Sequence, residues 1–481
     1  MSHFDLAVIG GGSGGFGAAL AAARRGLSVA LVERADCLGG TAVRAGVNSW
    51  EPGGGGTGIP FELYKRLKRV PEAIAIYSFG RHGAWHRPER EPYRFPGGES
   101  VCDPTRRYLD TLRRHGSKGL GRDEVFCREH WHGVIFEPQA MAAAMGQMLA
   151  EAGCRLFLNT AFAKAHARDG AVAFVALHDG ETLSADFYID ATGDGLVCAS
   201  VGCQEMTGQE SHGAFGEPHA PAKPTGHING VSLIYRVTPT AEAPAEPLPP
   251  GSAADCWWRA RFPGAAVHHY PNGDLNINML PTMDGGELLR IGRPAAHVEC
   301  RRRVRAHWHH LQTAYGEFRS YGLSWIAPML GVRESRRIVG EYVLAENDLL
   351  AGISRQRHED IICLADHAMD THGPHRGGCR ELAEPYGVPY RCLIPKGYRN
   401  LLIACRAASF TSLAASSCRL SRTMIQLGQA AGTAAAIAKQ LSTDLPNVPP
   451  HALRDALRKQ HVQPDHPMSR DVQRHLLDEQ S

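Results

Sequence analysis

The sequence lacks several features that would place it in a specialised class of protein. Its 13 cysteines include no C-x-x-C pair, which excludes the common zinc and iron–sulfur patterns and favours reduced thiols. Basic and acidic side chains nearly balance, at 52 against 49, so we expect no nucleic-acid partner. No uncharged apolar run reaches the roughly 20 residues of a membrane-spanning helix, so we expect no membrane span.

A secretory signal is also lacking. Met1 leads directly into a strand-forming segment, without a basic segment, an apolar core or a cleavage site, so we expect a cytoplasmic protein. The chain has 481 residues, 43% hydrophobic and 21% charged, which is typical of a globular protein with about three structural units. No internal repeat is evident, so we do not expect a solenoid.

The most informative segment is the N-terminus. Residues 4–9 form an apolar run typical of a strand, residues 16–25 are alanine-rich and helical in pattern, and residues 27–32 form a second strand-like run. A glycine-rich stretch separates the first strand from the helix. The predicted order is therefore strand, glycine turn, helix, strand.

The turn carries the spacing of a dinucleotide-binding fingerprint. Gly10 permits a tight turn, Gly12 lets the backbone approach a pyrophosphate, and Gly15 lets the helix pack closely on the strand. The helix N-terminus adds free N–H groups and partial positive charge. Glu33 follows Gly12 at close to the spacing of about 20 residues expected for an acidic residue that binds ribose hydroxyls. The motif predicts a site for FAD or NAD.

Later motifs resemble those of the glutathione-reductase-like FAD superfamily. They are Leu38-Gly39-Gly40-Thr41, Ala191-Thr192-Gly193-Asp194-Gly195 and Gly428-Gln429-Ala430-Ala431-Gly432. Stretches such as residues 46–50, 331–338 and 389–395 resemble a family of FAD-dependent oxidoreductases related to succinate dehydrogenase and fumarate reductase flavoproteins. The resemblance spans about residues 5–440. It implies FAD as cofactor and an α/β fold, with a discontinuous Rossmann-like FAD-binding domain and an inserted α+β substrate domain.

The resemblance also implies which residues contact FAD. The implied contacts are Gly10, Gly12, Gly15, Glu33, Arg34, Gly39, Gly40, Thr41, Asn48, Ala161, Gly193, Asp194, Cys405, Arg406, Gly428, Gln429, Ala430 and Ala431. The last four would lie at a helix N-terminus beside the isoalloxazine ring, where the helix stabilises the anion formed on reduction. The alternative for these four is that small residues let two helices pack closely.

The expected domains follow from the same resemblance and from the loop-like segments. We expect an FAD-binding domain, an insert or lid, a substrate domain, and a C-terminal linker and tail. The FAD-binding domain is expected to combine residues 1–60, 130–200 and 386–440. The insert is expected at residues 61–129, the substrate domain at residues 201–385, and the linker and tail at residues 441–481.

Two motifs of related flavoproteins are missing from the sequence, and their absence excludes some of the reactions that such proteins catalyse. Disulfide reductases of this superfamily carry G-G-T-C-x-x-x-x-C, but Ala42 and Val47 occupy the two cysteine positions, which excludes that dithiol chemistry. No second glycine fingerprint lies between a strand and a helix, so a built-in NAD(P)H domain is not expected. Electrons would pass through a substrate, oxygen, a quinone or a separate carrier.

A cluster of arginines is the first candidate for catalysis. Arg333 and Arg336, with Arg337, would lie on one side of a helix and could clamp a carboxylate. The alternative is an ion-paired motif that ties the two domains together.

The second candidate is the segment 366–375, which contains Asp370, His372 and His375. His372 is the favoured catalytic acid or base, because histidine titrates near neutral pH. The same residue types can bind a metal, and they also occur in ordinary loops. We expect no metal, because a flavin already supplies redox chemistry.

The predicted function is hydride transfer between FAD and a small, anionic organic substrate. Two alternatives are a flavin-dependent monooxygenase and an electron-transfer subunit without a substrate of its own. The sequence does not determine whether the protein passes electrons to a separate acceptor or whether it forms a homo-oligomer.

Overall fold

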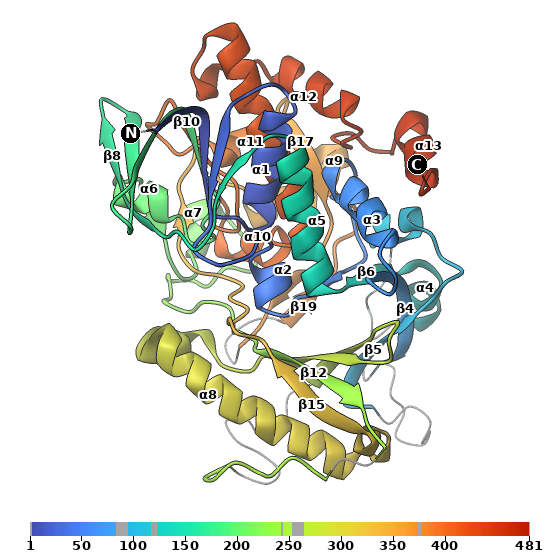
Figure 1. Ribbon diagram of the computed structural model, residues 1–481. Helices are drawn as coiled ribbons and strands as arrows, with labels where there is room; N and C mark the ends of the chain where they lie inside the picture. The colour runs from blue at the N-terminus through green and yellow to red at the C-terminus, as the bar shows by residue number, and fades with distance from the viewer. Residues whose placement is uncertain are drawn as a thin grey trace.

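The computed structural model describes residues 2–82, 95–116, 119, 123–241, 244–252, 264–373 and 378–480. Figure 1 shows two layers of structure. The upper part contains the first sheet and most of the helices, and the lower part contains a second sheet with the long helix α8 (Gly285–Ala314) beneath it.

The first sheet confirms the predicted α/β fold. Strand β1 (Ser2–Ile9) lies between β2 and β10, and its neighbours are parallel to it. Strands β9 and β8 extend the sheet as an antiparallel ribbon. The order β7-β2-β1-β10 continues to β21 on one path and to β9 and β8 on the other. The remaining bounds are β2 (Val29–Val32), β7 (Arg155–Phe157), β8 (Phe162–Arg168), β9 (Ala171–Leu177), β10 (Thr182–Asp190) and β21 (Leu401–Ile403).

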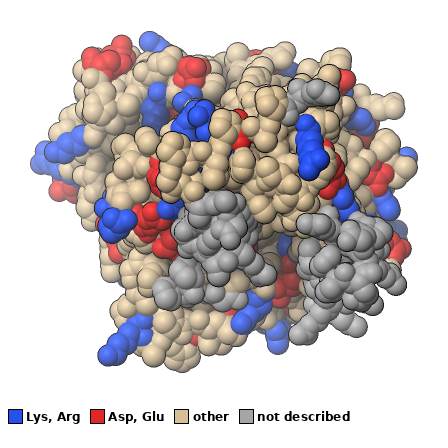
Figure 2. Space-filling model, turned by 90° about the horizontal axis from the view of Figure 1, so that it is seen from below, with Lys and Arg blue, Asp and Glu red and all other residues tan. Residues whose placement is uncertain are grey.

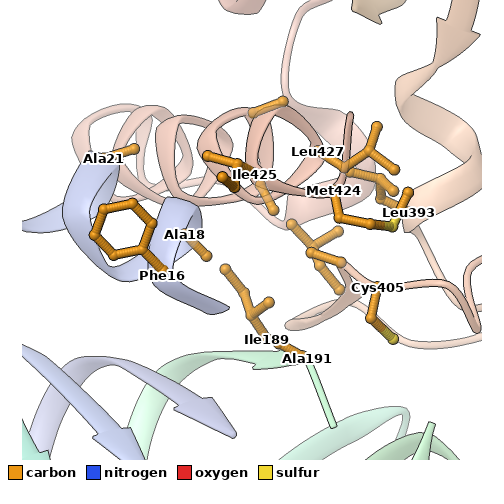
Figure 3. Close-up of a cluster of buried hydrophobic side chains, with 14 of the residues drawn as sticks. Phe16, Ala18, Ala21, Ile189, Ala191, Leu393, Cys405, Met424, Ile425 and Leu427 are labelled. Carbon is orange, nitrogen blue, oxygen red and sulfur yellow. The ribbon is translucent and has the colours of Figure 1, made fainter. Parts of the chain in front are cut away.

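Two helices of this part pack together through very small side chains. They are α1 (Ser13–Ala23) and α11 (Ser421–Leu441), which the close-up in Figure 3 shows beside Ile189 of β10. A Cβ atom at Gly428 would lie 1.9 Å from the carbonyl oxygen of Gly14, and one at Gly432 would lie 2.1 Å from that of Ala18. The backbones therefore approach as closely as glycine allows.

The second sheet has eight strands from three separate parts of the chain. Its order is β15-β12-β14-β13-β5-β4-β6-β3. The segment expected to form an insert, residues 61–129, contributes β4 and β5, which join strands from residues 201–385. The bounds are β3 (Ser49–Trp50), β4 (Ile74–His82), β5 (Gly97–Cys102), β6 (His132–Phe136), β12 (Ile234–Pro239), β13 (Gly264–His269), β14 (Leu275–Leu280) and β15 (Tyr321–Ile326).

Helix α8 covers the outer face of this sheet (Figure 1). Val304, Trp308 and Leu311 of the helix belong to the same buried cluster as Val267 of β13 and Ile277 of β14. Because side chains alternate along a strand, the neighbouring positions of β13 and β14 point to the other face.

The remaining elements fill the edges of the molecule. They are α2 (Thr41–Arg44), α3 (Ile59–Lys68), α4 (Glu124–His130), α5 (Pro138–Glu151), α6 (Leu196–Ser200), β11 (Glu205–Met206), α7 (His212–Phe215), β16 (Arg337–Ile338), α9 (Glu346–Arg355), β17 (Ile361–Ala365), β18 (Met369–Thr371), β19 (Gly378–Arg380), β20 (Tyr386–Pro389), α10 (Ser412–Ser417), α12 (Pro450–Lys459) and α13 (Arg470–Leu477).

The segment expected to be a linker and tail, residues 441–481, contains the two helices α12 and α13. Leu453 and Leu457 of α12 are buried, as are Val472 and Leu476 of α13. The spacing of four residues places each pair on one side of its helix, and all four join the main hydrophobic core.

The surface carries charges of both signs. Figure 2 shows Lys and Arg interspersed with Asp and Glu over the face seen from below. In the ranges that the structure describes, none of the helices combines the length and apolar composition needed to cross a membrane.

Candidate functional site

A cavity of about 1150 Å³ is lined by residues of both sheets. One wall comes from the turn between β1 and α1 and from the segments after β2 and β10. The opposite wall comes from the inner face of the eight-stranded sheet, including Ala266 and Asn278. Its size is at the upper end of the range for ligand pockets, which suits a large cofactor together with a substrate.

The glycine turn has the geometry that its spacing predicts. Gly10 has a φ of +107°, and a Cβ atom there would lie 2.4 Å from the carbonyl oxygen of Ala191. A Cβ atom at Gly15 would lie 1.8 Å from the carbonyl oxygen of Gly10. Both positions therefore require glycine so that helix, turn and strand can pack.

Gly12 differs from these two glycines, because it faces open space. A Cβ atom at Gly12 would have no neighbour closer than 4.0 Å, the Cα atom of Gly40. Gly12, Gly40 and Thr41 all line the cavity, and no side chain caps the N-terminus of α1. We call the space beside Gly12, Gly40 and Thr41 the glycine cradle. The first N–H groups of α1 are available to an anionic group in this cradle, as a pyrophosphate would require.

Glu33 lies at the end of β2 beside the turn. Its carboxylate accepts hydrogen bonds from the backbone N–H of Gly11 at 2.7 Å and of Ala35 at 2.9 Å. Glu33 and Arg34 both line the cavity. The carboxylate oxygens keep acceptor capacity for ribose hydroxyls, since each oxygen can accept two hydrogen bonds. These residues fit FAD.

A second predicted group lies after β10. Gly193, Asp194, Cys405 and Arg406 all line the cavity. Asp194 accepts hydrogen bonds from Arg406 at 2.8 Å and forms an ion pair with Arg293 at 2.8 Å. Burial raises the pKa of Asp194, but the positive charges of Arg406 and Arg293 outweigh it, so the pKa lies below its usual range. Burial raises the pKa of Cys405 to about 12, so its thiol stays protonated.

The structure corrects the placement of Gly428, Gln429, Ala430 and Ala431. These residues are in the interior of α11, where Gly428 packs on α1 and Gln429 accepts a hydrogen bond from Ile59 N–H at 3.1 Å. The helix begins at Ser421, and Leu420, Ser421 and Arg422 line the cavity instead. The helix-packing alternative therefore describes these four residues, since they are roughly 10 Å beyond the helix N-terminus.

Some predicted contacts do not line the cavity. The N–H of Gly39 donates to the carbonyl oxygen of Gly11 at 2.8 Å, so Gly39 supports the turn between β1 and α1. Asn48 is buried near Phe136, and Ala161 accepts a hydrogen bond from His178 N–H. The assignment of these residues to FAD stays a prediction.

Arg333 lies in the cavity wall, as a substrate-binding residue must. Its Nη1 donates to Gly230 O at 2.9 Å and to Ser232 Oγ at 3.0 Å. Burial and the nearby charge of Arg419 lower the pKa of Arg333 to about 10, so it remains protonated at neutral pH. Among the described residues, Arg333 has no ion-pair partner.

Arg336 and Arg337 do not join it, which corrects the arginine clamp. The segment is not helical and leads into β16, so the three side chains do not share one helical side. Arg336 lies outside the cavity and pairs with Glu205 at 3.0 Å. Arg337 is buried between Glu334 and Glu210. For these two residues, the ion-paired alternative is the better description.

His372 also lines the cavity, next to β18. Its Nε2 lies 2.7 Å from Oδ2 of Asp370, and Asp370 accepts a hydrogen bond from Arg419 at 2.8 Å. Burial lowers the pKa of His372, as do Arg333 and Arg419, against the opposing effect of Asp370. Burial raises the pKa of Asp370, but His372 and Arg419 lower this pKa by a larger amount. The net shift of the Asp370 pKa is therefore downward. His372 is therefore a neutral imidazole held by an ionised carboxylate.

The structure adds residues that the sequence did not single out as catalytic. Glu51 lies 3.0 Å from Nε2 of His367 and 3.2 Å from Nη1 of Arg114, and all three line the cavity. Arg419 joins them from the loop before α11. These residues are far apart in the chain and belong to no shared motif, so only their convergence identifies them. His375 lies outside the described residues.

The acidic and histidine residues of the site do not form a metal centre in the part of the chain that the structure describes. No group of three or more His, Cys, Asp or Glu side chains is arranged there to hold a metal ion. Asp370, beside His372, is instead paired with Arg419.

Comparison with known structures gives low similarity over long stretches. A geranylgeranyl bacteriochlorophyll reductase-like protein of Thermoplasma acidophilum is 11% identical with a TM-score of 0.44, over 100% of this chain and 97% of that chain. Glycine oxidase of Geobacillus kaustophilus is 12% identical with a TM-score of 0.39, over 90% and 93%.

Comparison of sequences identifies the family. A segment of 92 residues is 39% identical to 3-oxosteroid 1-dehydrogenase of Mycobacterium tuberculosis, and it covers 19% of this chain but only 15% of that protein. The family described as FAD dependent oxidoreductase matches residues 5–457, which is nearly the whole chain. The cofactor that the glycine cradle fits is thus FAD, and the chain belongs to the FAD dependent oxidoreductase family.

Proposed function

We propose that the protein transfers a hydride between FAD and a small organic anion, with Arg333 binding the anionic group and His372 exchanging a proton. The observation that carries this proposal is Arg333, a half-buried cation that lines the cavity without an ion-pair partner among the described residues.

A guanidinium that is partly withdrawn from water, with no carboxylate beside it, has lost part of its hydration without gaining a counter-charge. Only Nη1 of Arg333 has hydrogen-bond partners within the described residues, and these partners are neutral oxygens. A carboxylate on the substrate would supply the missing charge and accept two parallel hydrogen bonds, which is the arrangement that arginine favours. A neutral substrate would leave the guanidinium uncompensated.

His372 supports the proton transfer in this proposal. The neutral imidazole of His372 can accept a proton, and Asp370 holds its ring through Nε2. Arg419 keeps Asp370 ionised, so the carboxylate stabilises the imidazolium once it forms. The second ring nitrogen, Nδ1, is the atom that would exchange the proton with the substrate.

When bound, FAD supplies the hydride acceptor or donor. The chain contributes the environment of that exchange. The N-termini of α1 and α11 meet at the cavity, where Ser13 Oγ lies 3.1 Å from Ser421 Oγ. Both helices thus direct partial positive charge toward the space that FAD and substrate share.

The test is anaerobic screening of carboxylates and their uncharged amides for bleaching of the bound flavin, in wild-type protein and in Arg333→Gln and Arg336→Gln. We expect an organic acid to bleach the flavin and its amide to fail. Arg333→Gln should raise the KM for that acid at least tenfold, because a charge-assisted contact is lost.

Arg336→Gln is the matched control, since Arg336 lies outside the cavity, and it should behave as the wild type does. Equal reaction of acid and amide, or an unchanged KM in Arg333→Gln, would overturn the proposal. Consumption of NADPH and oxygen with a hydroxylated product would instead assign the chain to the monooxygenases.

A further inference from the structure

The inner face of the eight-stranded sheet carries polar side chains that the proposed reaction does not use. His268 of β13 is directly opposite Asn276 of β14, and Asn278 lies two residues further along β14, opposite Ala266. All of them line the cavity, on the wall that faces the FAD cradle. His268, Asn276 and Asn278 are named the floor residues below.

Each floor residue has a buried polar atom without a hydrogen-bond partner among the described residues. These atoms are Nδ1 of His268, Oδ1 of Asn276 and Oδ1 of Asn278. The burial is nearly complete for Asn276, which is 2% exposed, and for His268, which is 9% exposed. Buried polar groups in proteins are almost always hydrogen-bonded, so three such atoms on residues of one cavity wall make this wall a candidate contact for a polar group of a ligand.

The orientation of Asn276 is set by the protein itself. Its Nδ2 donates to the carbonyl oxygen of Gly46 at 3.0 Å, which leaves Oδ1 as the acceptor that faces away from that bond. Gly98 and Ala266, on the same inner face, also line the cavity, and they are too small to fill the space above the floor.

The floor residues present uncharged groups. Burial lowers the pKa of His268 to about 4, so its ring is neutral at physiological pH and one ring nitrogen can accept a hydrogen bond. The amide oxygens accept as well. A hydroxyl group suits such a surface, because it donates to these acceptors and carries no charge that would need a counter-ion.

Strand geometry relates the floor to Arg333. Arg333 donates to Ser232 Oγ, and Ser232 lies just before β12, in which Ile234 pairs with Asn278 and Arg236 pairs with Asn276. From Ser232 to Arg236 is four extended residues, which is roughly 13 Å. Asn278 lies about halfway along this distance and one strand, roughly 5 Å, to the side. His268 lies near the far end of it and two strands, roughly 10 Å, to the side.

We propose that the floor residues form a second substrate subsite, which binds a hydroxyl group carried roughly 8–16 Å from the anionic group that Arg333 holds. The inference rests on the proposed function, and it narrows the substrate to a hydroxylated organic acid of about that length.

The test is equilibrium dialysis of the FAD-loaded protein with hexanoate, octanoate and decanoate, each with and without a terminal hydroxyl group. We expect the hydroxylated acid to bind about tenfold more tightly at one or more chain lengths, as one or two net hydrogen bonds would give. A preference of twofold or less at every length, or no binding of any acid, would overturn the subsite.

Two variants test whether the floor residues cause the preference for the hydroxylated acid. Asn278→Leu and His268→Phe keep the approximate shape of the side chain but remove the unpartnered atom, so each should reduce the preference to about twofold or less. Asn447→Leu, an exposed position outside the cavity, is the control and should keep it. A preference that survives in both floor variants would overturn the proposal.

Two further measurements test whether the floor residues bind FAD instead of the substrate, and whether they bind a charged group instead of a hydroxyl group. The flavin content of both floor variants should match that of the wild type, and loss of FAD would assign these atoms to the cofactor and overturn the subsite. Tighter binding of acids with a terminal ammonium group would overturn the assignment to a neutral group.

Arg333→Gln distinguishes this inference from the proposed function. It should weaken both members of each pair about equally and leave the preference for the hydroxyl group unchanged. If it weakens neither while the preference remains, the role of Arg333 fails and the subsite stands.

Discussion

Single residues in the cavity are distinguished by their partners. Among the described residues, Arg333 is bonded only to neutral oxygens, whereas Arg337 is held between two glutamates. His372 is paired with Asp370, and this pair is bonded to Arg419. Side chains of the same type therefore have different chemical tasks, which their neighbours determine.

The pairing of His372 makes a prediction about pH. If the neutral imidazole accepts the proton, kcat/KM should rise with pH through the pKa of His372, which burial places below the usual value of about 6.5. Asp370→Asn removes an interaction that raises this pKa, so the acid limb should move to still lower pH. His372→Gln should lower kcat by about 100-fold or more and abolish the limb. A pH profile that is the same in all three proteins would contradict the role of His372.

At the scale of elements, the packing of α1 on α11 positions the site. The two helices touch through Gly14, Gly17, Gly428 and Gly432, so their N-termini are brought side by side at the cavity. Figure 3 shows Ala18 of α1 close to Ile425 of α11. A bulkier contact would separate the helices and move both N-termini away from the cofactor space.

This packing predicts opposite effects for two glycines that are both inside helices. Gly428→Ala places a methyl group 1.9 Å from a backbone oxygen that cannot move alone, so it should reduce the free energy of unfolding by about 2 kcal/mol or more. Gly146→Ala in α5 meets nothing within 4 Å and should add about 0.5–1 kcal/mol through the better helix propensity of alanine. Denaturant unfolding of both variants checks the pair. A Gly428→Ala protein as stable as the wild type would show that the two helices can separate at little cost.

At the scale of the whole molecule, the cavity joins two parts with separate cores. One core lies around the first sheet, and the other lies between α8 and the eight-stranded sheet. Residues from both parts line the cavity, so a bound cofactor would contact both. Binding to the folded state alone raises its stability in proportion to the logarithm of ligand concentration over Kd.

FAD should therefore raise the melting temperature of the stripped protein, with about 2.7 kcal/mol of stabilisation at a concentration of 100 Kd. Gly12→Ala should fold as the wild type does, because its backbone is extended at φ −73° and a Cβ atom meets nothing closer than 4.0 Å. The added methyl group nevertheless occupies the cradle, so FAD should bind at least about tenfold more weakly and raise the melting temperature less. An equal rise in both proteins would mean that FAD does not approach Gly12.

The sequence by itself determined the order of the first strand, turn, helix and second strand, and with it a dinucleotide-binding site, which the later motifs and the family match assign to FAD. Gly10, Gly12 and Gly15 work through local backbone geometry, so their spacing is readable from neighbouring residues. The same holds for Glu33, which directly follows β2.

Only the tertiary structure decided which side chains meet in the cavity. Arg333 and Arg336 are three residues apart, yet the non-helical backbone places one in the cavity and the other outside it. Glu51 and His367 meet although hundreds of residues separate them. The placement of Gly428 also depended on where α11 begins and on what packs against it. Such contacts arise from long-range packing, which no local pattern of residues encodes.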